Sequence, residues 1–280
     1  MLPNLIIIGA MKSGTTSLHN YLGLHPEIFM SNPKELNFFN LEFNWPKGVQ
    51  WYKSHFSDKT KIRGESSTSY TKYPTFKGVA ERMYSILPEI KIIYLIRDPI
   101  ERIISEYIHN FSQGRENRTF TDTLKNIENN HYVNCSKYYA QLEQYLKFYS
   151  ISNILIITAY DLMNNRVKTL KKIFKFLNVE EAFYCNDYSK VFHKSIEKRR
   201  INTMGLFLKR VQQQISPEFK NIIKWILPSY FLQNYNNLTS SKINATALRT
   251  SIKKELTNHL RNDVEQLRQL TGYSFLDWCL

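Results

Sequence analysis

A glycine loop near the start of the chain constrains the fold more than any other feature. Leu5–Ile8 is a short, continuous apolar run, as expected for a strand buried on both faces. The loop GAMKSGTTS follows, and Thr16–Leu24 then has helical periodicity, with Ser13 or Thr15 as the candidate N-cap. Backbone N–H groups at the start of a helix after such a loop bind anions, normally phosphate. The sequence therefore predicts a strand–loop–helix unit with a phosphate site, here called the glycine loop (Gly9–Ser17).

The side chains of the glycine loop support the same interpretation. Lys12 adds a full positive charge, and hydroxyl donors occupy most of the positions around it. The alternative is a plain strand-to-helix turn that needs glycine only for its backbone. A lysine and four hydroxyls within six positions favour the anion site, and the candidate ligands are Lys12, Ser13, Gly14, Thr15, Thr16 and Ser17.

Strand and helix patterns alternate along the rest of the first two thirds of the chain. Lys91–Ile96 and Asn153–Thr158 are further buried strands, each followed by a helical pattern. Such alternation predicts an α/β fold, P-loop-like, with three layers in which helices flank a central, mainly parallel sheet. Ligands bind beyond the carboxyl ends of the strands in these sheets, where the glycine loop and Arg97 both lie. The other predicted helices are Phe76–Leu87, Ile100–Phe111, the stretch from Asp161 to Leu177, Lys137–Tyr149 and Ala245–Leu270.

The length of 280 residues is compatible with a single domain, and the whole chain is predicted to form one. The stretch 203–240 differs because it is amphipathic and rich in aromatic residues, with prolines at 217 and 228. It is either a pair of helices that cover the core, or a helical lid or acceptor-binding cap. A membrane-surface or dimer contact is a further alternative, so the oligomeric state stays open.

Charge and cysteine usage limit the classes of partner. The formal net charge of +14 fits nucleic acid, an anionic membrane surface or a small polyanionic ligand. No nucleic-acid-binding signature is present, and no apolar run is long enough to span a membrane. The three cysteines and seven histidines lack metal-ligand spacing, so no metal is expected. We therefore expect a reduced, soluble, cytoplasmic protein that binds a small anionic molecule.

The glycine loop is not a Walker A loop. That motif places its lysine directly after the last glycine, whereas Lys12 comes two residues before Gly14. A P-loop NTPase also needs an aspartate that helps to hold magnesium, but the second strand ends in Arg97. A cation at that place suggests a second anionic group on the ligand. The sequence thus indicates a nucleotide with phosphate at two separate points and no obvious metal.

This combination resembles the sulfotransferases that use 3′-phosphoadenosine 5′-phosphosulfate (PAPS), and particularly their heparan-sulfate-type and bacterial branch. The resemblance rests on five motifs in family order: IIIGAMKSGTTSLHNYLGLHPEIF, PKELNFFN, GVQWYKSHF, RGESSTSY and YLIRDPIERIISEYIH. It implies that the residues 12–17 grip the 5′-phosphosulfate and that Lys12 stabilises the leaving oxygen. It also implies that Arg97 and Ser105 bind the 3′-phosphate and that Tyr160 lies near the adenine. By position alone, Lys198, Arg199 and Arg200 are candidates for a basic loop over the 3′-phosphate, although a solvated charged face is the alternative.

The resemblance places the general base at Glu35. Leu36, Phe38 and Phe39 surround it in the sequence, so partial desolvation is expected to raise its pKa. Lys34 either opposes that shift or contacts the sulfate. The alternative is that Glu35 forms a helix cap or a surface ion pair.

Four residues are predicted on the acceptor side: Lys34, Phe38, Glu65 and Tyr70. Relatives often carry a lysine directly after the glutamate of RGESSTSY, where this chain has Ser66. Either Lys12 and Lys34 suffice without it, or Lys72 reaches in from the same segment.

The predicted function is transfer of a sulfuryl group from PAPS to a hydroxyl or amine of a small-molecule or carbohydrate acceptor, with 3′-phosphoadenosine 5′-phosphate (PAP) as product and no metal. Two alternatives stay open. One is an ATP-dependent small-molecule kinase on a related fold, and the other is a non-catalytic binder of sulfated glycans. The acceptor is not identifiable from the residues, and lipid-linked sugars or natural products of secondary metabolism also fit.

Overall fold

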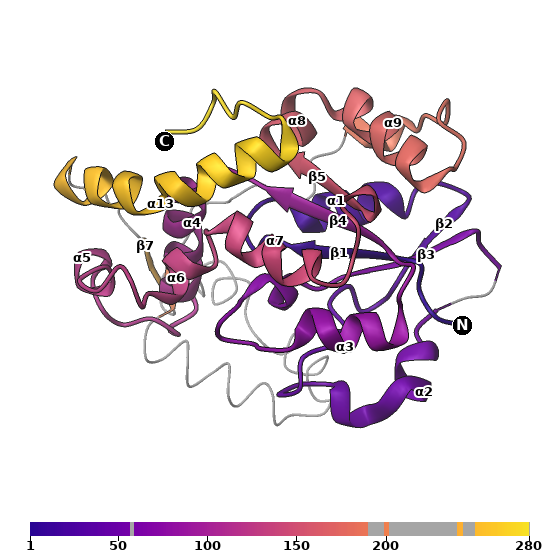
Figure 1. Cartoon of the computed structure of the whole chain (residues 1–280), viewed down its shortest axis with the longest axis horizontal. Helices are drawn as coiled ribbons and strands as arrows, with labels where there is room; N and C mark the ends of the chain where they lie inside the picture. The colour runs from indigo at the N-terminus through magenta and orange to yellow at the C-terminus, as the bar shows by residue number, and fades with distance from the viewer. Residues whose placement is uncertain (57–58, 190–198, 202–239, 243–249, 280) are drawn as a thin grey trace, which may run out of the picture.

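A five-stranded parallel sheet forms the centre of the molecule in the computed structural model, which describes residues 1–56, 59–189, 199–201, 240–242 and 250–279 (Figure 1). The strand order is β2-β3-β1-β4-β5. Parallel pairing throughout the sheet requires a crossover between neighbouring strands, and the helices supply it. The strands are β1 (Leu5–Gly9), β2 (Ile28–Met30), β3 (Ile62–Ser66), β4 (Lys91–Ile96) and β5 (Ile154–Thr158).

Helices cover both faces of this sheet. Alternate residues of β1 pack into different clusters: Ile6 and Ile8 on one face, Leu5 and Ile7 on the other. Because successive side chains of a strand point to opposite faces, a continuous apolar run is what a sheet covered on both sides needs. The helices are α1 (Thr15–Leu22), α2 (Gly48–Lys53), α3 (Val79–Ile86), α4 (Pro99–Ser112), α5 (Phe120–Thr123), α6 (His131–Asn134), α7 (Tyr138–Leu146), α8 (Ala159–Asn164), α9 (Arg166–Leu177) and α13 (Thr250–Thr271).

The two faces carry different helices. Residues of α2, α3, α7 and α13 join the cluster that contains Ile6, and residues of α1 and α9 join the cluster that contains Leu5. A third cluster lies among α4, α5, α6 and α13, beyond the ends of β1 and β4 (Figure 1). The predicted three-layer α/β fold is confirmed.

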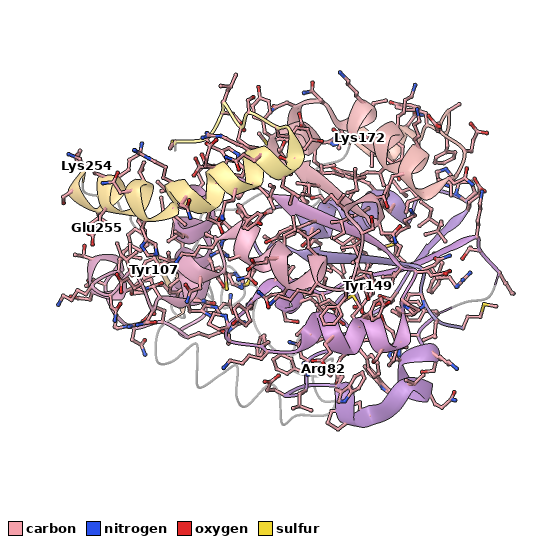
Figure 2. The ribbon with its side chains drawn as sticks, viewed as in Figure 1. Arg82, Tyr107, Tyr149, Lys172, Lys254 and Glu255 are labelled. Carbon is pink, nitrogen blue, oxygen red and sulfur yellow. The ribbon has the colours of Figure 1, made fainter. Side chains whose placement is uncertain are left out.

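The long helix α13 crosses the molecule and is fastened by a buried carboxylate. Asp263 accepts hydrogen bonds from the backbone N–H groups of Tyr139 and Ala140 at the start of α7, at 3.0 and 2.9 Å. The charged residues Lys254 and Glu255 lie at the outer end of the helix (Figure 2). Among the helices that the structure describes, none combines the length and the apolarity that a membrane span requires.

Two local predictions differ from the structure. The N-cap of α1 is Gly14, with a φ of 98° and no side-chain cap, rather than Ser13 or Thr15. The left-handed backbone at Gly14 favours glycine and turns the chain into the helix without a hydroxyl cap. The helical pattern after β5 also forms two helices, α8 and α9, which meet at Asn165. The predicted lid, residues 203–240, falls outside the described residues except for the first residue of the short strand β7 (Ser240–Lys242).

Candidate active site

The glycine loop connects β1 to α1 and leaves several groups available to a ligand. Gly14 is exposed and Thr16 is half-buried, whereas Ser13 and Thr15 are buried. The Oγ of Ser13 is buried and has no hydrogen-bond partner among the described residues. This hydroxyl is therefore available to donate to an anion at the loop. The loop as predicted is therefore compatible with an anion at the start of α1.

Lys12 lies in this loop with a left-handed backbone (φ 71°). Its ammonium makes no hydrogen bond or ion pair with another residue of the described part of the chain. Burial lowers the pKa of Lys12, the charge of Arg97 lowers it further, and Glu106 acts in the opposite direction. An anionic ligand close to Lys12 would offset both the burial of the ammonium and the repulsion from Arg97. This arrangement is therefore suited to binding an anion.

Arg97 follows β4 and contacts the glycine loop directly. Its Nη1 donates to the backbone carbonyl of Lys12 at 3.2 Å, and its Nη2 forms an ion pair with Glu101 on α4. Its Nε is buried without a hydrogen-bond partner among the described residues. Ser105 lies one turn after Glu101 on the same helix and is half-buried. The structure thus brings Arg97 and the glycine loop together, as predicted. It also shows that Glu101 pairs with Arg97, a contact that the sequence indicated only through the i,i+4 spacing of the two residues.

The remaining predicted donor contacts lie at the edges of this region. Tyr160 is exposed on α8, directly after β5. Arg199 and Arg200 fall in the short strand β6 (Arg199–Ile201), which contacts α4, the helix that carries Ser105. This placement is compatible with the predicted role of the two arginines. Lys198 lies outside the described residues.

Lys34 joins the glycine loop to the predicted base. Its Nζ lies 3.3 Å from Thr15 Oγ1 and 2.8 Å from Glu35 Oε1. The hydroxyl of Thr68 donates to the other oxygen of Glu35 at 3.3 Å. Glu35 therefore lies one side chain away from the loop, within reach of a group bound there.

Glu35 is exposed, whereas its apolar neighbours predicted partial desolvation. Its side chain is 40% exposed and forms an ion pair with Lys34, although Leu36, Phe38 and Phe39 are buried. These apolar neighbours pack in a core cluster, and Asn37 among them adopts a positive φ of 47°. Local apolar sequence did not translate into a desolvated carboxylate.

Glu65, which was predicted to contact the acceptor, is instead fully buried beneath this segment. It accepts hydrogen bonds from the hydroxyls of Tyr52 (2.7 Å), Tyr70 (2.8 Å) and Ser67 (2.6 Å). The backbone N–H of Leu36, next to Glu35, lies 3.4 Å from the same carboxylate. Burial raises the pKa of Glu65, although these hydrogen bonds oppose the shift.

Phe38 and Tyr70 take the same supporting role. Phe38 is fully buried, and the hydroxyl of Tyr70 accepts from its backbone N–H at 2.8 Å. Direct contact with an acceptor requires accessible atoms, which Phe38 and Glu65 do not offer. The correction is that Glu65, Tyr70 and Phe38 hold the Glu35 segment in place from below.

Ser66, the residue after Glu65, pairs with a histidine that sequence reasoning did not single out. Nδ1 of His19 lies 2.9 Å from Ser66 Oγ, and both residues are buried. Burial and the nearby charge of Lys34 lower the pKa of His19 to about 4. His19 is therefore neutral at pH 7 and adds no charge beside Lys34.

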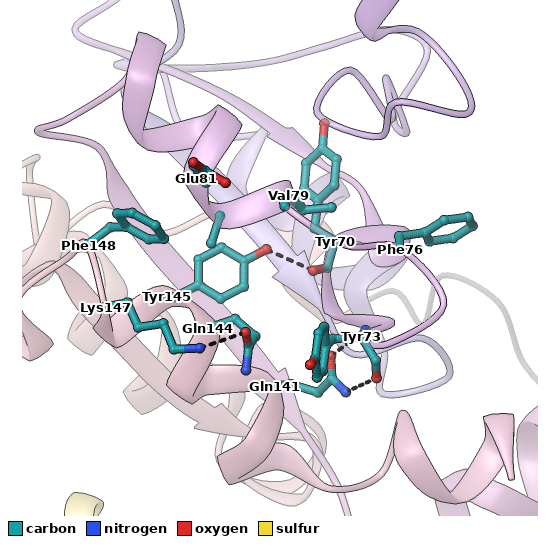
Figure 3. Close-up of a pocket in the computed structure, with 12 residues that line it drawn as sticks. Tyr70, Tyr73, Phe76, Val79, Glu81, Gln141, Gln144, Tyr145, Lys147 and Phe148 are labelled. Atoms are coloured by element: carbon teal, nitrogen blue, oxygen red, sulfur yellow. Dashed lines mark hydrogen bonds between the residues drawn. The ribbon is translucent and has the colours of Figure 1, made fainter. Parts of the chain in front are cut away.

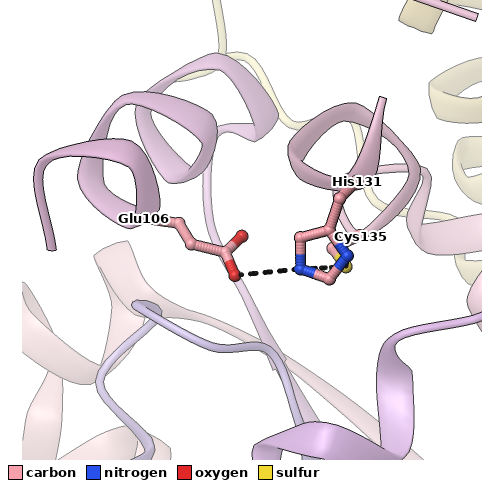
Figure 4. Close-up of side chains that lie close together, drawn as sticks. All are labelled: Glu106, His131 and Cys135. Carbon is pink, nitrogen blue, oxygen red and sulfur yellow. Dashed lines mark hydrogen bonds and ion pairs between the residues drawn. The ribbon is translucent and has the colours of Figure 1, made fainter. Parts of the chain in front are cut away.

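On the other side of the loop, five residues form a charged group that we call the Glu106 cluster: Glu106, Arg102, Lys72, His131 and Cys135 (Figure 4 draws three of them). One oxygen of Glu106 lies 2.7 Å from Arg102 Nη1, and the other lies 3.5 Å from His131 Nε2 and 3.7 Å from Lys72 Nζ. Although burial disfavours its charge, these cations hold the pKa of Glu106 well below its usual range.

The same cluster contains a set of residues that could hold a metal ion, Glu106, His131 and Cys135. Hydrogen bonds to Cys135 and Glu106 raise the pKa of His131 to about 9, so a metal ion would have to displace a proton from this imidazole at pH 7. Arg102 and Lys72 already compensate the carboxylate. We interpret the cluster as an ion-pair network and assign no metal to it.

A cleft of about 240 Å³ opens between α3 and α7 (Figure 3). Its wall includes Tyr70 and Tyr145, whose hydroxyl donates to the backbone carbonyl of Tyr70 at 2.8 Å. No residue of the glycine loop lines it. The cleft therefore lies behind the Tyr70 segment and is separate from the donor side of the site.

Comparison with known proteins identifies relatives that align with most of this sequence. The family model for the sulfotransferase domain matches residues 2–220. The chain is 30% identical over 220 residues to heparan sulfate glucosamine 3-O-sulfotransferase 5 of Mus musculus and of Homo sapiens, which covers 70% of this chain and 62% of each relative. It is also 30% identical over 200 residues to the human bifunctional heparan sulfate N-deacetylase/N-sulfotransferase 2, covering 64% of this chain and 22% of that protein. The chain thus spans less than two thirds of the length of these curated relatives.

A solved structure agrees over nearly the whole chain. A sulfotransferase from Alicyclobacillus acidocaldarius superposes with a TM-score of 0.70 at 22% identity, covering 99% of both chains. This likeness supports the fold, and the family model supports the enzyme class. The chain therefore belongs to the sulfotransferase family, whose enzymes take the sulfuryl group from PAPS.

Proposed function

We propose that this protein transfers the sulfuryl group of PAPS to a hydroxyl or amine of a carbohydrate or small-molecule acceptor, with Glu35 as general base. The observation that carries the proposal is the position of Lys34, whose ammonium lies between Glu35 and Thr15 of the glycine loop. Base and donor loop are thereby held within one side chain of each other, which an in-line transfer requires.

The roles of the residues follow from their contacts. PAPS supplies an activated sulfuryl group on a phosphate leaving group. Lys12, whose ammonium has no partner among the described residues, would neutralise the bridging oxygen as the sulfur–oxygen bond breaks. Glu35, which is 40% exposed, would accept the proton of the acceptor while the acceptor oxygen or nitrogen bonds to sulfur. Arg97 and Ser105 would hold the 3′-phosphate on the far side of Lys12.

The acceptor proposed first is an anionic carbohydrate. Two relatives are named for sulfation of heparan sulfate, and the net charge of +14 would attract a polyanionic chain. A small neutral molecule is the alternative that the test below must separate. The chain would act in the cytoplasm, which is our proposal from its expected solubility and reduced cysteines.

Nucleotide binding and turnover test the proposed function together. PAP at about 100 times its Kd should raise the melting temperature, since selective binding to the folded state contributes about 2.7 kcal/mol, whereas ATP with magnesium should not. Sulfuryl transfer from labelled PAPS is then measured with heparan sulfate fragments and with small phenols and amines. Stabilisation by ATP alone would favour the kinase, and PAP binding without transfer to any acceptor would favour a binding protein.

Substitution of the base gives a sharper measurement. Glu35→Gln keeps the shape of the side chain but cannot take a proton, so we expect kcat to fall roughly 10²–10⁴-fold while the Kd for PAP stays within about twofold. Glu42→Gln, an exposed glutamate of the same segment, is the control and should match the wild type. Full turnover by Glu35→Gln would remove this residue from the mechanism.

A further inference from the structure

Lys72 reaches the glycine loop from a segment that is packed tightly against it. This lysine follows the short helix η2 (Thr68–Thr71), and Thr71 donates to the carbonyl of Ile8 at 3.1 Å. A Cβ on Gly9 would lie only 2.1 Å from Thr71 Oγ1, so glycine is needed for the close approach of the two segments. Lys72 is thereby held against the beginning of the loop, and its Nζ lies 3.2 Å from the sulfur of Met11.

Glu106 orients Lys72 without using its hydrogen-bonding capacity. The distance of 3.7 Å between Lys72 Nζ and Glu106 Oε1 is an ion pair but too long for a hydrogen bond. The thioether of Met11 is only a weak acceptor, and an ammonium has three donors. Lys72, which is 17% exposed, therefore retains strong donors for an anion that enters from solvent.

The position of Lys72 also distinguishes it from Arg97. The helix η2 that precedes Lys72 carries Thr68, whose hydroxyl contacts the carboxylate of Glu35. Lys72 thus comes from the segment that also supports the base, whereas Arg97 follows β4. Both side chains then pair with glutamates of α4, Glu106 for Lys72 and Glu101 for Arg97. In an in-line transfer, the sulfuryl group lies between the base and the leaving oxygen.

We propose that Lys72 is a further catalytic residue that contacts the sulfuryl oxygens of PAPS, and that Glu106 positions it. This inference rests on the proposed function. It assigns the chain three lysines around the transferring group: Lys12 in the loop, Lys34 beside Thr15 and Lys72 beside Met11. Lys72 would stabilise the charge on the sulfuryl oxygens, whereas PAP, which lacks this group, would not engage it.

Labelling of the wild-type protein tests this contact without any substitution. Lysines are reductively methylated briefly in buffer alone, with PAP and with PAPS in the absence of acceptor, and the modification of each lysine is measured by mass spectrometry. We expect PAPS to protect Lys72 at least about threefold more than PAP does, while both nucleotides protect Lys12. Equal labelling of Lys72 with PAP and PAPS would overturn the proposal.

Kinetics of Lys72→Met provide the second test. The substitution removes the charge while keeping an unbranched chain, and loss of a donor that serves the transition state typically costs about 10²–10³-fold in kcat. We expect kcat to fall by at least about tenfold with little change in the Kd for PAP, and Lys72→Arg to recover part of the loss. Lys77→Met, an exposed lysine of the same segment, is the matched control.

The outcomes separate this inference from the proposed function. If the wild type binds PAP and transfers sulfuryl groups but Lys72→Met matches it, only the inference fails. If the wild type neither binds PAP nor transfers, the proposed function itself fails. A parallel loss of PAP affinity and kcat would show that Lys72 serves phosphate binding and would overturn the sulfuryl contact. If Lys72→Met does not fold, the labelling result on the wild type decides.

Discussion

Two buried glutamates support the site from opposite sides, and they are stabilised in different ways. Glu65 lies beneath the Glu35 segment and Glu106 lies beneath the glycine loop, and both are fully buried. The partners of Glu65 are neutral hydroxyls and a backbone N–H, whereas those of Glu106 are an arginine, a lysine and a protonated histidine.

The difference explains what each carboxylate can do. The pKa of Glu65 is raised because burial outweighs its neutral hydrogen bonds, and the pKa of Glu106 is lowered because its cations outweigh burial. Neutral donors are suited to fixing a backbone segment beside a base. A charged carboxylate is suited to holding lysines and arginines next to a loop that must bind an anion.

Substitution of Glu65 and of Glu106 by glutamine should therefore destabilise the protein unequally. The loss for Glu106→Gln is the largest effect on stability that we expect. Glu106→Gln leaves Arg102 as a buried unpaired cation, which typically costs about 3–5 kcal/mol of unfolding free energy. Glu65→Gln replaces a charge that burial already disfavours, so its cost should be about 1–3 kcal/mol from imperfect hydrogen bonds.

Urea denaturation of both variants measures this difference. Glu143→Gln, an exposed glutamate on α7, is the control and should stay within about 0.5 kcal/mol of the wild type. Equal losses for Glu65→Gln and Glu106→Gln would show that the nature of the partners does not matter, contrary to our interpretation.

The two tyrosines on Glu65 sharpen the comparison within one region. The hydroxyl of Tyr52 contacts only Glu65 among the described residues, whereas that of Tyr70 also accepts from the N–H of Phe38. Tyr70→Phe leaves this buried N–H unpaired and should cost about 1–3 kcal/mol, against about 0.5–1.5 kcal/mol for Tyr52→Phe. Tyr70→Phe should also lower kcat, because the Glu35 segment loses an anchor.

Tyr84 is 41% exposed, and Tyr84→Phe serves as the control in the measurements of thermal unfolding and turnover. A larger loss for Tyr52→Phe than for Tyr70→Phe would contradict the assigned hydrogen bonds.

The ion pairs of Glu106 should also make stability depend on pH, and we expect this effect to be smaller and more gradual than the effects of the substitutions above. The pKa of His131 is raised from 6.5 to about 9, so the folded state binds this proton more tightly than the unfolded state does. The contribution of His131 is therefore complete below pH 6.5 and is lost as the pH rises through about 9. We expect His131→Gln to flatten this alkaline decline, measured by urea titration from pH 6 to 9.5.

His55→Gln is the matched control for this measurement and should retain the slope of the wild type. The acid side has the opposite sign: because the pKa of Glu106 is lowered, its contribution is present above 4.5 and is lost as the pH falls further. If the alkaline slope of stability against pH is unchanged in His131→Gln, the histidine does not form a stabilising ion pair with Glu106.

Much of the donor side could be predicted from the sequence because it is local. The strand Leu5–Ile8, the lysine in the loop and Arg97 after β4 are each set by a few neighbouring residues, and parallel strands bring their carboxyl ends together. The family, the enzyme class and the PAPS donor could be predicted for the same reason, because the motifs are short and contiguous. All three are confirmed. The predicted roles of Glu35, Tyr160 and the arginines of β6 stay predictions.

The supporting shell was decided by tertiary structure alone. Glu65 meets Tyr52 and Leu36 across 13 and 29 residues, and Lys72 meets Met11 across 61 residues. No local pattern reports which distant side chains will surround a carboxylate, and so the sequence could not tell a buried support from an acceptor contact. By itself the sequence determined the strand–loop–helix unit and its charges. Packing decided that Glu35 faces solvent, that Glu65 does not, and which cations gather around Glu106, because burial depends on segments that meet only after folding.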